Sequence, residues 1–87
     1  MSFLDISNCQ EIALLYCSSN QLADLDVSKN KKLTELDCGS NQLSTLKIDN
    51  NFALKKLLCY ENKLTHLDLS KNDKLVELSC GGNQLTV

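Results

Sequence analysis

The sequence has no proline and no tryptophan, only three glycines and two phenylalanines, and no long uninterrupted apolar run. Without roughly 18 consecutive apolar residues no membrane-spanning helix is expected, and residues 1–10 lack the basic segment and apolar run of a signal peptide. Because aromatic side chains are scarce, leucine dominates the apolar content. The sequence therefore predicts a soluble chain with a leucine core.

An excess of positive charge is also lacking, since the formal net charge is −2 at pH 7. Such a balance exerts no overall pull on phosphate backbones, and the sequence shows no local basic patch that would provide one. We therefore expect neither nucleic acid nor membrane as a partner. With 87 residues the chain has room for one domain only, because a chain this short buries about 60 to 65% of its unfolded surface.

What the sequence does contain is a period of 21 residues. Such periods are typical of solenoids, in which each unit buries its apolar side against its neighbours. The predicted single array (1–87) consists of a half-unit at 1–11, full units at 12–32, 33–53 and 54–74, and a partial unit at 75–87.

Each unit is built from two near-copies, L-x-x-L-x-C-x-x-N-x and L-x-x-L-x-(V/I/L)-(S/D)-x-N-x-x. This spacing fits neither a helical stripe nor a long alternating strand, and it favours a coil with a short extended piece around x-L-x-C that directs Leu and Cys inward. The recurring Asn is expected to bond backbone groups in the following bend, and stacked copies to bond one another. The predicted structural ladders are Cys17, Cys38, Cys59 and Cys80, and Asn20, Asn41, Asn62 and Asn83.

The full pattern, carried by residues 12–32 and 54–74, resembles the 21-residue bacterial leucine-rich repeat. It is similar to internalin J-like and Bacteroidetes surface repeats, which carry a cysteine at the sixth position. The resemblance implies a leucine-rich repeat solenoid of about four coils, with parallel β-strands on the concave face and extended, 3-10 or β segments on the convex face, used for adhesion or recognition. The departures are Cys9 in an Asn column, Lys-Ile-Asp at 47–49, and no recognisable caps.

Five cysteines raise the alternatives of zinc, disulfides or a nucleophile. Zinc needs four converging ligands, whereas cysteines 21 residues apart lie in a row. A disulfide between neighbouring coils suits the Cα separation but not the Cβ directions, so buried, reduced thiols are favoured. Cys9, near the exposed first coil, is the exception, and it is expected to dimerise the chain only under oxidation.

Neither the single histidine nor the aspartates indicate catalysis. His66 shares an outward column with Phe3, Asp24 and Thr45, away from the inward cysteines, so no nucleophile and base meet. No cofactor or metal site is expected. A column of carboxylates at Asp5, Asp26 and Asp68, interrupted by Lys47, favours solvated turns over the alternative of a loosely held calcium ion.

A binding surface is expected on the concave wall, where the outward residues differ between coils. Exposed Leu, and Tyr as a common interface anchor, favour a partner site there over the alternative of scattered surface apolar residues. The predicted partner-binding residues are Leu14, Tyr16, Glu35, Asp37, Lys56, Leu58, Tyr60 and Glu77, with Leu14, Tyr16, Leu58 and Tyr60 expected to be exposed.

The sequence thus predicts a noncatalytic module that binds a protein or glycan. Its parent is expected to be a secreted or surface-attached bacterial protein of adhesin-like or effector-like type, although the chain carries no signal peptide. The alternative is a structural scaffold or spacer, natural or designed, whose uncapped ends self-associate into homo-oligomers.

Overall fold

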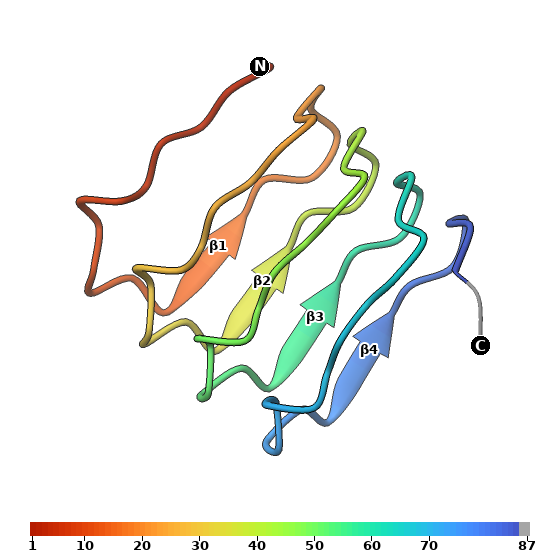
Figure 1. Cartoon of the computed structure of the whole chain (residues 1–87). Helices are drawn as coiled ribbons and strands as arrows, with labels where there is room; N and C mark the ends of the chain where they lie inside the picture. The colour runs from red at the N-terminus through yellow and green to blue at the C-terminus, as the bar shows by residue number, and fades with distance from the viewer. Residues whose placement is uncertain (86–87) are drawn as a thin grey trace.

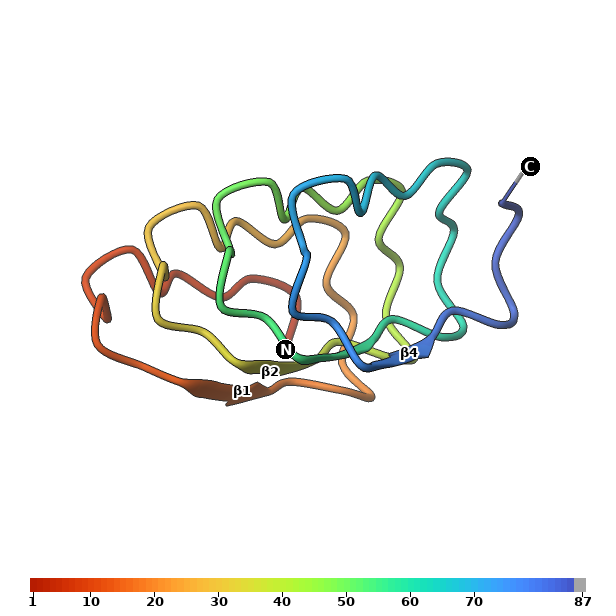
Figure 2. The same ribbon diagram turned by 90° about the horizontal axis from the view of Figure 1, so that it is seen from below.

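In the computed structural model, which describes residues 1–85, the chain winds into a stack of coils, each contributing one short strand to a single sheet (Figure 1). The strands are β1 (Leu14–Tyr16), β2 (Glu35–Asp37), β3 (Lys56–Leu58) and β4 (Glu77–Ser79). They are parallel and adjacent in chain order, β1-β2-β3-β4. Viewed from below, the strands line one side of the stack and the return segments line the other (Figure 2).

Equivalent residues lie directly beside each other, as the 21-residue period predicts. Leu15 pairs with Leu36, Leu36 with Leu57, and Leu57 with Leu78. The N–H of Lys55 donates to the Thr34 carbonyl at 2.8 Å, and the same bond recurs one coil on, from Val76 to Lys55. The predicted solenoid of about four coils is therefore confirmed.

A single apolar core runs along the axis of the stack. Its buried members are Ile6, Cys17, Leu22, Leu25, Val27, Leu33, Leu36, Cys38, Leu43, Leu46, Ile48, Leu54, Leu57, Cys59 and Leu64. The leucine columns are less buried at the two ends, and Leu78 is 41% exposed, since coils there pack on one neighbour only. The stack is thus held by contacts between successive coils.

The return segments are extended and end in paired turns before each strand. One backbone bond per coil joins them, for example from the Gln42 N–H to the Leu22 carbonyl at 2.8 Å. Within residues 1–85 there is no helix long and apolar enough to cross a membrane. Of the extended, 3-10 and β segments that the repeat implies for the convex side, the structure shows the extended type.

Candidate interaction surface

The cysteine ladder forms part of the core. Cys17, Cys38 and Cys59 are buried, Cys80 in the last coil is partly buried, and all four are free thiols. Burial raises the pKa of the Cys38 thiol far above its usual value and that of Cys59 to about 11. A thiol held protonated is a poor nucleophile and a poor metal ligand, so these cysteines act as small apolar side chains.

The predicted asparagine ladder holds the bend after each strand. Asn41 Nδ2 donates to the carbonyls of Cys17, Cys38 and Gly39 at 3.1, 3.0 and 3.2 Å, and Asn41 Oδ1 accepts from the Leu22 N–H at 3.0 Å. Asn62 repeats the arrangement one coil on. Two stacked asparagines bond one another directly, since the Asn62 N–H donates to Asn83 Oδ1 at 3.2 Å. The other bonds of the ladder side chains go to backbone groups of their own and the neighbouring coils.

A second asparagine ladder, absent from the predicted set, stabilises the turns on the other edge. Asn30, Asn51 and Asn72 are buried, and each donates from Nδ2 to two carbonyls, as Asn51 does to Val27 and Asn30 at 3.1 and 3.0 Å. Their Oδ1 atoms have no hydrogen-bond partner within residues 1–85. The N in the second half of the repeat was the signal for this ladder. Cys9, which replaces it in the first coil, is exposed.

The outward residues of the strands, here called the sheet face, include two prominent apolar side chains. Leu14 and Tyr16 on β1 are 54% and 62% exposed, as predicted. The Tyr16 hydroxyl donates to Glu35 Oε1 at 2.5 Å, and this bond to a carboxylate raises the pKa of the phenol. Across the sheet Lys56 Nζ lies 3.8 Å from Glu77 Oε2. The sheet face therefore combines an apolar end with charged side chains.

The expectation that Leu58 and Tyr60 are exposed is wrong, because both are half-buried. Tyr60 is not a strand residue but follows β3, and its ring lies over Gly39 in the preceding coil. A Cβ added to Gly39 would come within 2.3 Å of Tyr60 Cζ. A glycine under the ring is the sequence signal for this packing, since only its bare backbone admits the ring so closely.

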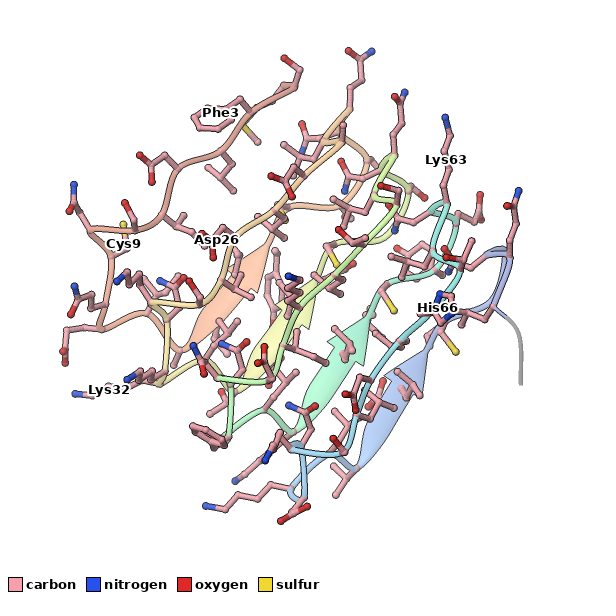
Figure 3. All side chains as sticks on the ribbon, viewed as in Figure 1. Phe3, Cys9, Asp26, Lys32, Lys63 and His66 are labelled. Carbon is pink, nitrogen blue, oxygen red and sulfur yellow. The ribbon has the colours of Figure 1, made fainter. Side chains whose placement is uncertain are left out.

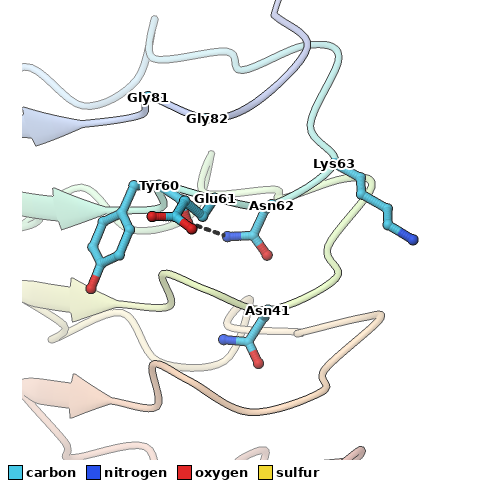
Figure 4. Close-up of a pocket in the computed structure, with 7 residues that line it drawn as sticks. All are labelled: Asn41, Tyr60, Glu61, Asn62, Lys63, Gly81 and Gly82. Atoms are coloured by element: carbon cyan, nitrogen blue, oxygen red, sulfur yellow. Dashed lines mark hydrogen bonds between the residues drawn. The ribbon is translucent and has the colours of Figure 1, made fainter.

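A hollow of about 750 Å³ lies beside Tyr60, where the strands end (Figure 4). Asn62, whose Nδ2 bonds the Tyr60 carbonyl at 3.1 Å, forms part of its wall. Lys63 extends away from the Tyr60 ring. The lining residues are Asn41, Tyr60, Glu61, Asn62, Lys63, Gly81 and Gly82.

The aspartate column on the convex side forms turns. Asp26 Oδ1 accepts from the Ser28 N–H, and Asp68 Oδ1 from the Ser70 N–H, both at 2.9 Å. Hydrogen bonds from the side chain and backbone of Ser28 lower the pKa of the Asp26 carboxyl. His66 is exposed and bonds the neighbouring Thr65 side chain (Figure 3). No group of three or more possible metal-ligating side chains occurs within residues 1–85.

Lysines gather along the turns that precede the strands, a concentration that overall composition does not reveal. Lys32, at this edge in Figure 3, bonds Glu11 Oε1 at 2.6 Å. The lysines in these turns are Lys29, Lys31, Lys32, Lys71 and Lys74. Glu11, Asp49 and Asp73 lie in the same row of turns, so these lysines do not form a purely basic edge, and the absence of a nucleic-acid partner stays a prediction.

Parallel in-register strands, one per 21-residue coil, with buried leucine and asparagine columns define a leucine-rich repeat solenoid. No protein-family model matches the sequence, and no curated protein sequence does. Solved structures do match. The functional domain of InlJ from Listeria monocytogenes, which includes a cysteine ladder, is 32% identical, with a TM-score of 0.93 over 94% of this chain and 18% of that one.

Two further structures from the same organism have the same fold. Internalin C2 is 24% identical with a TM-score of 0.91, and internalin F is 28% identical with a TM-score of 0.87. Each match covers 94% of this chain, but only 38% and 26% of the respective internalin chains. The chain thus spans well under half the length of these structures. It is an internalin-like leucine-rich repeat array of the cysteine-ladder type.

Proposed function

We propose that the chain is a noncatalytic recognition module that binds another protein through its sheet face. The exposure of Leu14 and Tyr16 on β1 is the observation that carries the proposal. Water alone favours polar side chains at such positions, and Tyr beside an aliphatic side chain is typical of interface anchors. Glu35, Asp37, Lys56 and Glu77 supply a polar surround, and similarity to internalin repeats supports a protein partner.

A bacterial adhesin-like or effector-like parent fits this function, with the array as its binding surface. The sheet is a suitable platform because its backbone is fixed by bonds between coils, so little ordering cost arises on association. The competing function is a structural spacer that self-associates, and the partly exposed Leu78 on β4 is the observation in its favour. If the chain is a recognition module, loss of Leu14 and Tyr16 should weaken partner binding. If it is a spacer, their loss should change its self-association.

Peptides selected from a random phage library against the immobilised chain provide the probes for a test. We expect them to lose about tenfold or more in affinity for a Leu14→Ser/Tyr16→Ser double variant, equivalent to at least about 1.4 kcal/mol. Phe52→Ser, which removes an equally exposed aromatic ring from a turn, is the matched control and should retain binding. Equal binding to the double variant contradicts the proposal, and loss of chain association in light scattering supports the spacer.

A further inference from the structure

The three glycines differ in what the fold requires of them. Gly39 lies under the Tyr60 ring, and Gly82 has a positive φ of 69° and lies against Glu61. Gly81 has neither constraint, since a Cβ built on it would meet nothing within 4 Å. Gly81 is therefore the glycine that leaves space for a group the size of a side chain.

Gly81 lies between the side chains of Tyr60 and Glu61, which point in opposite directions. Tyr60 leans back over Gly39, and Glu61 leans forward over Gly82, where a Cβ would come within 2.9 Å of Glu61 Cγ. One face of the Tyr60 ring is therefore covered, and no heavy atom outside residues 80–82 lies within 4 Å of the Cβ position at Gly81. Tyr60, Glu61 and Gly81 line the hollow of about 750 Å³ in Figure 4.

The hollow is held by backbone bonds on both sides. The Tyr60 carbonyl accepts from the Ser40 N–H at 2.9 Å, and the Glu61 N–H donates to the Gly81 carbonyl at 2.8 Å. Glu61 itself has a φ of 51°, in the left-handed region, which sets the direction of its Cα–Cβ bond. The backbone that carries the Tyr60 and Glu61 side chains is thus held in place without a ligand, which lowers the ordering cost of binding.

We propose that Tyr60, Glu61 and Gly81 form a seat for an arginine side chain of a protein partner. A guanidinium is flat, stacks on aromatic faces and pairs with carboxylates through two parallel N–H donors. Gly81 leaves room for that plane beside the ring. Lys63 leaves the space free because it points away. This inference rests on the proposed recognition function and names one contact of it, next to the sheet face.

The test uses N-acetylarginine amide as the probe, titrated into the isotope-labelled chain and followed by two-dimensional NMR. We expect saturable shifts of the Gly81 and Gly82 amide signals. Glu61→Gln is expected to weaken binding about two- to fivefold, and Gly81→Leu, which places a side chain in the open space at residue 81, to abolish it. Asp73→Asn, which removes an exposed carboxylate in the turn before β4, is the control and should bind like the original chain.

Three results overturn the proposal. They are an absence of saturable shifts, equal binding by the Glu61→Gln variant, and equal shifts of the same amides by methyl glucoside, which would indicate a sugar site. Glu61→Gln alters an exposed side chain, so its effect is not a folding effect. The probe needs neither Leu14 nor Tyr16, so failure at this seat leaves the proposed function of the sheet face standing, and the peptide test can fail without affecting the seat.

Discussion

The Tyr60 ring covers Gly39 so closely that a Cβ at residue 39 would lie 2.3, 2.5 and 2.6 Å from three ring atoms. The two residues are 21 positions apart and belong to successive coils. This contact links two successive coils through a glycine. Its strength can be measured by substitution of either residue.

We expect Gly39→Ala to lower the free energy of unfolding by about 1–3 kcal/mol, because the ring must move to admit the methyl group. Gly81→Ala is the control, since its Cβ enters open space. It should be neutral or stabilising by up to about 1 kcal/mol. Urea unfolding monitored by circular dichroism measures both. Equal losses in the two variants would mean that the ring imposes no constraint.

Asn41→Ala should be among the most destabilising single changes, at about 2–4 kcal/mol. It leaves the Leu22 N–H without its partner in a buried bend, and it removes one of the donors to each of the Cys17, Cys38 and Gly39 carbonyls. Asn20 bonds only carbonyls of its own coil and is partly exposed. Its replacement by Ala should cost about 0.5–1.5 kcal/mol. Similar costs at the two positions would contradict the role of bonds between coils.

The residue before each ladder asparagine has a left-handed backbone. Ser19, Ser40 and Glu61 have φ values of 58°, 54° and 51°, and Gly82 occupies the same position with 69°. Since a Cβ is unfavourable in this region, Ser40→Gly should raise stability by about 0.5–1 kcal/mol in thermal unfolding. Ser40→Ala retains the Cβ and should give no gain. A gain of equal size in Ser40→Ala would exclude backbone relief as the cause.

The buried thiols make the array sensitive to alkali. Burial raises the pKa of Cys59 from 9.0 to about 11, so the folded chain favours the protonated form. The resulting stability is complete below pH 9 and is lost as the pH rises towards 11. Urea unfolding under reducing conditions at pH 8 and pH 10.5 should show this decline. A Cys38→Ala/Cys59→Ala variant should decline less, since two of the buried thiols are then absent, and an identical decline would refute the explanation.

The interior could be predicted from the sequence because every coil repeats the same constraint. Leu36 and Cys38 are surrounded by equivalents on both sides, so the period alone determines that they are buried. The first asparagine ladder is predicted for the same reason. The prediction does not include Asn30, Asn51 and Asn72 as a second ladder. The column assigns a residue its position in the coil, and a buried position leaves its side chain little choice of direction.

The outward surface could be predicted only in part, because neighbours that differ from coil to coil decide where a side chain lies. Tyr16 precedes its ladder cysteine and Tyr60 follows its own, and both are predicted to be exposed. Tyr16 extends into solvent beside Glu35, whereas Tyr60 packs over Gly39. The hollow above Gly81 depends on Glu61 leaning the other way. No column of the repeat specifies such directions, so they emerge from pairs of residues one period apart.

The matched register of β1 to β4 also means that a coil can be removed without reshaping what remains. Excision of residues 33–53 would bring Leu15 against Leu57 and Cys17 against Cys59, so the core columns would close again in phase. The sheet face would change, because Tyr16 would have Lys56 as its neighbour in place of Glu35. The shorter array would be strained only where the Tyr60 ring packed against Ser18 in place of Gly39. One compensating substitution would be needed there.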